Sequence, residues 1–131
     1  MERFPVKSAK KPRRVEEMTV FVLSCDGRYA LQKRPNQGLL AGLWQFPNVP
    51  GRLELPDALA FLEGRGVSVR DVYRQIEKKH IFTHIEWKMT GYYLEITERC
   101  SDFIWMSNEE IQEDAALPTA FRQFWEEISH V

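Results

Sequence analysis

Apolar and polar residues alternate in short runs over much of the chain, which is the pattern of half-buried strands. Thr19–Cys25 and Arg28–Arg34 are rich in β-branched and aromatic residues. Asp26-Gly27 between them predicts a two-residue hairpin, because both turn positions favour positive φ. After a glycine-bearing loop over Asn36–Gly42, four further strands are predicted, at Leu43–Phe46, Val72–His80, Ile85–Ile96 and Asp102–Met106.

Three other segments show helical signals. Leu55–Arg65 has Pro56 in its first turn and glycines at its end, which predicts a helix. Ser107 and Glu110 form a capping box before a short helical turn. A final helix begins at Leu117-Pro118, and its apolar side chains make one stripe: Phe121, Phe124, Trp125 and Ile128. The order of elements predicts an α+β fold with a mixed or mostly antiparallel sheet flanked by helices.

The composition is typical of a single globular domain, with 44% hydrophobic and 12% aromatic residues among 131. No run reaches the length of a membrane span, and the N-terminus lacks the apolar core of a secretory signal. We therefore expect a cytoplasmic protein. Cys25 and Cys100 have no metal-ligand spacing, so we expect two ordinary thiols and no metal site in this chain.

The net charge of −1 hides an uneven distribution. Residues 1–14 contain six basic residues and one acid, whereas residues 101–131 contain seven acids and one arginine. Residues 1–17 also contain Pro5 and Pro12, which predicts a basic linker or arm ahead of a domain over residues 18–131. The arm is either a solvated linker or a segment that follows a phosphate backbone.

Four stretches, in order along the chain, resemble one family. They are Phe4–Lys7 (FPVK), Gly38–Pro47 (GLLAGLWQFP), His80–Trp87 (HIFTHIEW) and Leu117–Arg122 (LPTAFR). They are similar to segments of the C-terminal domain of MutY-type adenine DNA glycosylases: its entry linker, its GLLAGLWEFP signature, its H-x-F-S-H-x-x-W segment and its LPTAFRK ending. The resemblance implies a Nudix (MutT-like) fold.

In that family the C-terminal domain recognises 8-oxoguanine opposite adenine, and an N-terminal domain with a 4Fe-4S cluster excises the adenine. The resemblance therefore implies a monomeric recognition domain that is not catalytic alone. Its expected partners are double-stranded DNA containing 8-oxoguanine:adenine and the catalytic domain of its own enzyme, at the bacterial nucleoid. We carry over no catalytic residue, and the cluster is expected in the N-terminal domain of the parent enzyme.

The resemblance also marks Phe82, Thr83 and His84 as candidates for lesion recognition. Thr83 stands where the family has serine, and its hydroxyl can donate and accept a hydrogen bond. Phe82 would wedge into the base stack, and His84 would contact a phosphate or brace the loop. Without the resemblance, the same three residues would be interpreted as a core residue, a turn residue and a structural histidine.

Four basic residues are candidates for contacts with the DNA backbone: Arg34, Lys78, Lys79 and Lys88. Because Lys78 and Lys79 are adjacent in a predicted strand, at most one of them should face the duplex.

Two other functions use the same fold. A Nudix pyrophosphohydrolase needs an Arg-Glu-x-x-Glu-Glu cluster on one helix to hold magnesium. The corresponding helix here offers only Asp57 and Glu63, which point about 120° apart. A protein-interaction module is the other alternative, with the loops Asn48–Leu55 and Glu98–Asp102 as its surfaces.

Overall fold

The computed structural model describes residues 13–113 and 117–129, so most of the basic arm over residues 1–17 lies outside the described residues. In chain order the elements are β1 (Arg14–Cys25), β2 (Arg28–Lys33), β3 (Trp44–Gln45), β4 (Asn48–Pro50), α2 (Leu55–Gly64), β5 (Val69–Ile81), β6 (Ile85–Ile96), β7 (Ile104–Ser107), α3 (Asn108–Glu113) and α4 (Thr119–Ser129).

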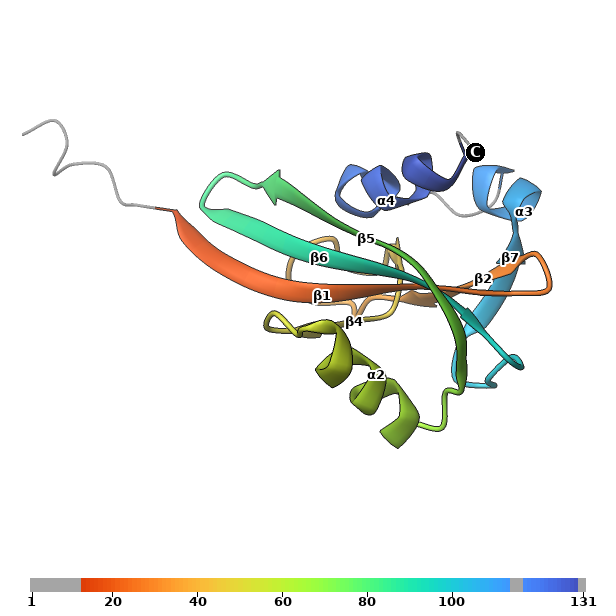
Figure 1. Cartoon of the computed structure of the whole chain (residues 1–131). Helices are drawn as coiled ribbons and strands as arrows, with labels where there is room; N and C mark the ends of the chain where they lie inside the picture. Colours follow the sequence, from red (N-terminus) through yellow and green to blue (C-terminus); the bar gives the residue numbers. More distant parts are fainter. Residues whose placement is uncertain (1–12, 114–116, 130–131) are drawn as a thin grey trace, which may run out of the picture.

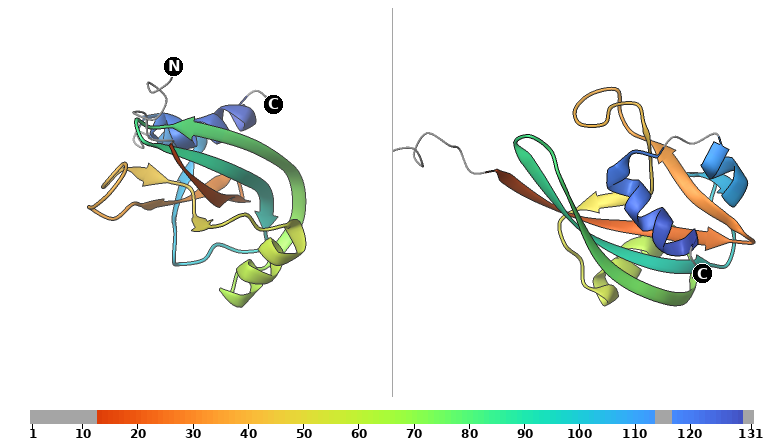
Figure 2. Two further views of the ribbon diagram at one scale, coloured as in Figure 1. Left: turned by 90° about the vertical axis from the view of Figure 1, so that its left-hand side faces the viewer. Right: turned by 90° about the horizontal axis from the view of Figure 1, so that it is seen from above.

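The strands form one mixed sheet with the order β3-β2-β1-β6-β5, while β4 pairs with β1 and β7 pairs with β2. The two long strands β1 and β6 are parallel, and the other pairs are antiparallel. Helix α4 lies across one face of this sheet and α2 lies on the other (Figures 1 and 2). The predicted α+β class with a mixed sheet between helices is confirmed.

The domain has two hydrophobic cores because alternate residues of β1 point to opposite faces of the sheet. Val20 and Val22 pack with Phe121 of α4, whereas Phe21 and Leu23 pack with Leu62 of α2. The aromatic stripe predicted for the last helix is confirmed: Phe121, Phe124 and Trp125 are buried, and Ile128 packs against them.

The first hairpin forms as predicted, with φ of 53° at Asp26 and 78° at Gly27. Several strand boundaries differ from the prediction by one to three residues, and the start of β1 differs most. β1 begins at Arg14 rather than Thr19, and Arg14–Glu17 pairs with β6 although we expected it in the linker. The side chains there are mostly exposed on both faces, so no alternation marks the strand.

Strand β4 was not predicted, because Pro47 and Pro50 interrupt the pattern of its three residues. It lies in the loop expected to offer a partner surface, and it pairs with β1 between Met18 and Val20. Part of that loop is therefore built into the sheet.

The sheet is longer than the helices that cover it. At one end the hairpin between β5 and β6, together with the start of β1, projects beyond α2 and α4 (Figure 1). This end of the sheet carries the residues Phe82–His84. Among the described helices, none is long and apolar enough to cross a membrane.

Candidate nucleic-acid interface

The tip of the projecting hairpin is a tight turn with Thr83 and His84 at its corners. The Phe82 N–H donates a hydrogen bond of 2.7 Å to the Ile85 carbonyl, and the His84 carbonyl accepts one of 3.1 Å from the Arg14 N–H. The Thr83 and His84 side chains are exposed, and neither forms a hydrogen bond with another described residue. The backbone of the turn is thus fixed from two sides, while both corner side chains face solvent.

Phe82 is different, because its ring packs back onto the domain. Its centroid lies 4.8 Å from His80 and 4.9 Å from Trp87, both in edge-to-face geometry. Trp87 is only 2% exposed, and its indole N–H donates to Glu16 Oε1 at 3.2 Å. Phe82 is therefore half-buried at the edge of the α4-side core. Insertion into a base stack would require its ring to leave Trp87.

The guanidinium of Arg34 contacts other residues of the domain. Its Nε donates to the Leu39 carbonyl at 2.9 Å and its Nη1 to Gln45 Oε1 at 2.7 Å. The guanidinium also lies over the Trp87 ring, 5.1 Å from the centroid, and its burial lowers the pKa of Arg34. These contacts brace the Asn36–Gly42 loop, in which Leu40 adopts a positive φ of 56°.

The three candidate lysines divide between the two faces of the hairpin. Lys78 points toward α4, where its Nζ lies 3.0 Å from Glu127 Oε2. Lys79 and Lys88 are exposed and directly opposite each other in the β5–β6 register, and neither forms an ion pair with another described residue. Like charges in this position repel each other, so an anion bound between them would relieve the repulsion.

Lys79 and Lys88 line a shallow hollow of about 430 Å³ on the face of the sheet that carries α2. Arg52 closes one side of this hollow. Its Nη1 donates to Glu77 Oε2 at 2.7 Å and to Thr90 Oγ1 at 3.1 Å. Its charge is therefore neutralised by Glu77. Glu17 and Lys78 also line the hollow, and Glu17 lies beside Lys88 in the β1–β6 register. Because Lys78 pairs with Glu127, the two unpaired lysines face one carboxylate, and the hollow has a small excess of positive charge.

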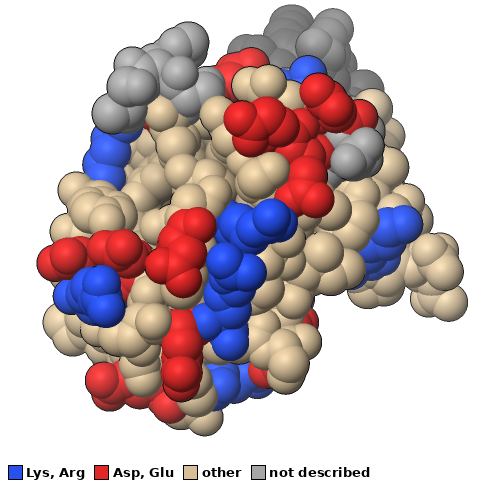
Figure 3. Space-filling model, turned by 90° about the vertical axis from the view of Figure 1, so that its right-hand side faces the viewer, with Lys and Arg blue, Asp and Glu red and all other residues tan. Residues whose placement is uncertain are grey.

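Acidic side chains gather at the other end of the molecule. In the view onto that end, one group of them lies near the top, and others lie lower down among Lys and Arg side chains (Figure 3). Among the helices, α3 carries Glu109, Glu110 and Glu113, and α4 carries Glu126 and Glu127. The hairpin end carries Lys79, Lys88, Arg13 and Arg14, of which Arg13 lies 4.0 Å from Glu86 and Arg14 lies 2.9 Å from Glu16. Lys79 and Lys88 are therefore the cations of this end that have no ion pair with another described residue.

Helix α2 is the helix predicted at Leu55–Arg65, which was expected to offer Asp57 and Glu63 in place of the Nudix glutamates. Its acids Asp57 and Glu63 are both exposed, and the preceding residue Glu54 is paired with Arg52 at 3.3 Å. Among the described residues, no group of three or more His, Cys, Asp or Glu side chains is placed to hold a metal ion.

This fold and site define the class of the protein. A family model described as NUDIX domain matches residues 19–127, so the chain belongs to the NUDIX domain family. The solved structure of the C-terminal domain of mouse MUTYH, in complex with human PCNA, matches with a TM-score of 0.66 and 24% identity over 88% of each chain. A MutT protein from Methanosarcina mazei matches with a TM-score of 0.65 and 18% identity, over 92% of this chain and 97% of that one.

Two curated relatives of the chain are adenine DNA glycosylases. Adenine DNA glycosylase from Schizosaccharomyces pombe is 28% identical over 130 residues, which cover 84% of this chain and 28% of the yeast enzyme. The human adenine DNA glycosylase is 48% identical over 50 residues, or 35% of this chain and 9% of that enzyme. Within its family, the chain is thus a Nudix-like domain of the MutY C-terminal type. It spans less than a third of the length of these glycosylases.

Proposed function

We propose that this domain recognises 8-oxoguanine opposite adenine, as part of an adenine DNA glycosylase that acts in base excision repair. The observation that carries the proposal is the exposed Thr83 hydroxyl at the tip of the projecting hairpin, on a turn whose backbone is fixed by Ile85 and Arg14. The similarity to adenine DNA glycosylases supports adenine excision as the reaction in which such a tip would take part.

The chemistry of the lesion explains why a hydroxyl suits this position. The adenine to be excised is a normal base, so damage must be detected on the opposite base. Oxidation at C8 of guanine turns N7 from an acceptor into a donor and adds a carbonyl acceptor beside it. The Thr83 hydroxyl can accept from the first group and donate to the second. On this part of its edge, guanine offers only the N7 acceptor. The hydroxyl can therefore form one hydrogen bond there with guanine and two with 8-oxoguanine, which favours the lesion.

The two unpaired lysines of the hairpin determine the orientation that we propose for the domain on DNA. Lys79 and Lys88 are unpaired and lie on the same hairpin as Thr83, so they are placed to contact phosphates while the turn reaches the bases. The acidic helix α3 lies at the end of the domain opposite the hairpin tip, away from the proposed position of the duplex (Figure 1). Excision itself is assigned to the N-terminal domain of the parent enzyme, where we place the catalytic carboxylates and the 4Fe-4S cluster.

The role of the lysines is tested by the salt dependence of DNA binding. Replacing both Lys79 and Lys88 with glutamine should weaken binding to a lesion duplex and lower the log–log salt slope by about 2, because two phosphate contacts are lost. Lys78→Gln is the matched control, since Lys78 already pairs with Glu127. It should leave the slope unchanged. Fluorescence anisotropy titrations at several salt concentrations measure both slopes.

An unchanged slope in the double variant would contradict this orientation. A loss in Lys78→Gln equal to that of the double variant would place the duplex on the α4 face instead.

A further inference from the structure

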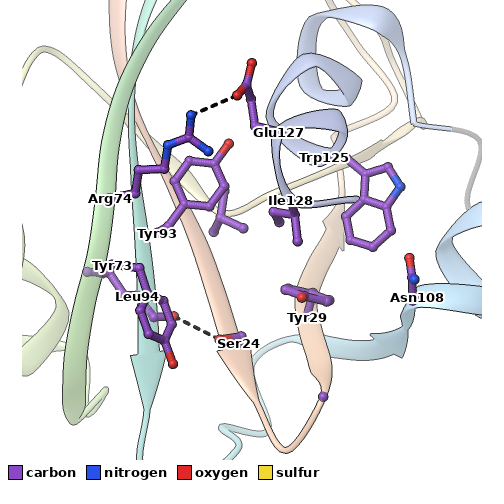
Figure 4. Close-up of a pocket in the computed structure, with 12 residues that line it drawn as sticks. Ser24, Tyr29, Tyr73, Arg74, Tyr93, Leu94, Asn108, Trp125, Glu127 and Ile128 are labelled. Carbon is purple, nitrogen blue, oxygen red and sulfur yellow. Dashed lines mark hydrogen bonds and ion pairs between the residues drawn. The ribbon is translucent and has the colours of Figure 1, made fainter. Parts of the chain in front are cut away.

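A second hollow, of about 560 Å³, lies on the α4 face of the sheet, away from the hairpin tip. Its walls come from β1, β2, β5, β6, α3 and α4, and neither Thr83 nor the two unpaired lysines line it. In Figure 4, Arg74, Tyr73 and Tyr93 stand on one side, Trp125 and Asn108 on the other, and Tyr29 between them. Its volume is in the range of small-molecule sites.

The walls of this hollow are flat, aromatic and fixed. Tyr29 and Trp125 form an edge-to-face pair with centroids 5.3 Å apart and an interplanar angle of 81°. The hydroxyl of Tyr93 donates to the Phe124 carbonyl at 2.7 Å, and that of Tyr73 donates to Glu95 at 2.7 Å. Such rigid rings offer stacking and edge contacts to a planar ligand.

Two polar groups among these rings have no partner. Trp125 is only 6% exposed, yet its indole N–H donates to no acceptor in the described chain. The Tyr29 hydroxyl likewise has no hydrogen bond to a described residue, and burial raises the pKa of Tyr29, so that it remains a neutral donor. Tyr29 is only half-buried, but a donor on a residue as buried as Trp125 is nearly always satisfied in folded proteins. A ligand that brings acceptor atoms would satisfy both.

Arg74 and Glu127 are the charged residues that line the hollow among the described residues. Glu127 is held between two cations, with Arg74 Nη2 and Lys78 Nζ each 3.0 Å from one of its oxygens. Lys78 does not line the hollow, but the guanidinium N–H groups of Arg74 that do not contact Glu127 have no acceptor among the described residues. These N–H groups therefore favour an anionic group.

We propose that this hollow binds a small planar aromatic anion. Its ring lies against Tyr29, Trp125 and Tyr93, its acceptor atoms face the Trp125 N–H and the Tyr29 hydroxyl, and its anionic group lies near Arg74. A nucleoside monophosphate and an aromatic carboxylate share this chemistry. The site is independent of the proposed DNA function, because the two involve different residues at separate places on the domain.

The test is a titration of the ¹⁵N-labelled chain, followed by NMR, with dGMP, with indole-3-acetate and with the uncharged deoxyguanosine. The indole N–H signal of Trp125, assigned with Trp125→Phe, should shift and saturate with at least one of the two anions at millimolar or lower concentration. Deoxyguanosine should bind more weakly. Saturation by dGMP alone assigns the site to nucleotides, and saturation by indole-3-acetate alone assigns it to aromatic carboxylates.

Two variants with opposite effects make the test specific. Tyr29→Phe keeps the ring and removes one hydrogen bond, so it should weaken binding by about 2- to 10-fold. Glu127→Gln releases Arg74 and Lys78 from their carboxylate and should tighten binding. Arg65→Gln, a change on the opposite face against Phe61, is the matched control and should have no effect.

Failure of both anions to move the Trp125 signal would overturn the proposal, as would equal binding of deoxyguanosine or equal affinity in all three variants. If dGMP shifts only signals of Lys79 and Lys88, the aromatic site is wrong while the phosphate contacts of the proposed function stand.

Discussion

Phe82 and Thr83 are neighbours in the sequence, but they face different surroundings. The Phe82 ring packs between His80 and Trp87, whereas the Thr83 side chain is exposed at the corner of the turn. Packing and recognition are thus divided between adjacent residues. The phenyl ring supports the turn, and the hydroxyl beside it remains free to read a base.

This division leads to a stability prediction. Phe82→Ala should destabilise the fold by about 2 kcal/mol, less than the 3–5 kcal/mol of a fully buried phenylalanine, because the ring is only half-buried. Thr83→Val should leave stability within about 0.5 kcal/mol, as expected for an exposed residue. Urea unfolding of the two variants and the wild type measures both values. If Phe82→Ala is as stable as the wild type, the ring does not support the turn. Insertion of Phe82 into the base stack is then the favoured role.

For single residues, the sequence predicted which side chains are buried better than it predicted their hydrogen-bond and ion-pair partners. Trp87, Tyr93 and Phe46 are core residues as expected, because large apolar side chains on strands have few alternatives. The alternation of Lys78 and Lys79 predicted that at most one of them faces the duplex; Lys78 pairs with Glu127 of α4, although both lysines border the same hollow. The contacts of Arg34 could not be predicted, since its acceptor on Leu39 exists only once the Asn36–Gly42 loop has folded.

Among the elements, the fit of α4 onto β6 depends on a glycine. A Cβ atom built on Gly91 would lie 2.4 Å from Cε1 of Phe124, closer than any real contact of this kind. Gly91→Ala should therefore cost about 1–3 kcal/mol through overpacking. Gly64→Ala is the matched control, because its Cβ meets open space at the end of α2, and it should be neutral or stabilising by up to about 1 kcal/mol. Thermal unfolding compares them, and a neutral Gly91→Ala would refute this packing of α4.

The short helix α3 is held by the capping box that the sequence predicted. The Ser107 N–H donates to Glu110 Oε1 at 2.8 Å, and the Glu110 N–H donates to Ser107 Oγ at 3.2 Å. The hydrogen bond from the Ser107 backbone, aided by Arg28, lowers the pKa of Glu110. A carboxylate with a lowered pKa stabilises the fold above its unfolded pKa of about 4.3, and this stabilisation is lost as the pH falls through the folded value.

Glu110→Gln should accordingly reduce stability at neutral pH and flatten the loss of stability below about pH 4.3. Thermal unfolding between neutral and acidic pH measures this change. The exposed neighbour Glu109 is the control position, and Glu109→Gln should retain the wild-type acid dependence. If stability falls with acid in the same way in Glu110→Gln and in the wild type, the capping box does not stabilise the fold through the charge of Glu110.

Elements with a strong local pattern were predictable, and those fixed by distant partners were not. The hairpin at Asp26-Gly27 follows from two turn residues that tolerate positive φ. By contrast, β4 and the first residues of β1 are strands only because the remainder of the sheet offers them partners, namely Thr19 for β4 and Ile85 for Arg14. Such tertiary pairing overrides weak local preferences.

For the whole molecule, the parallel pairing of β1 with β6 decides where the candidate site lies. It joins Arg14 to Ile85, more than 70 positions apart in the sequence, and so brings the start of the domain beside the Phe82–His84 turn. No local pattern carried this information, although the family resemblance pointed to the turn itself. The pairing places Arg14 at the hairpin end of the sheet, opposite α3 (Figure 1).

The central claim is that the Thr83 hydroxyl distinguishes 8-oxoguanine from guanine. Its most direct test joins the domain to an adenine glycosylase catalytic domain and compares excision rates for adenine opposite each base. Thr83→Val keeps the shape of the side chain and removes its hydroxyl, so the preference for 8-oxoguanine should fall by about 1–3 kcal/mol. Thr83→Ser keeps the hydroxyl and should retain the preference. An unchanged preference in folded Thr83→Val would contradict the claim and assign recognition to the backbone of the turn.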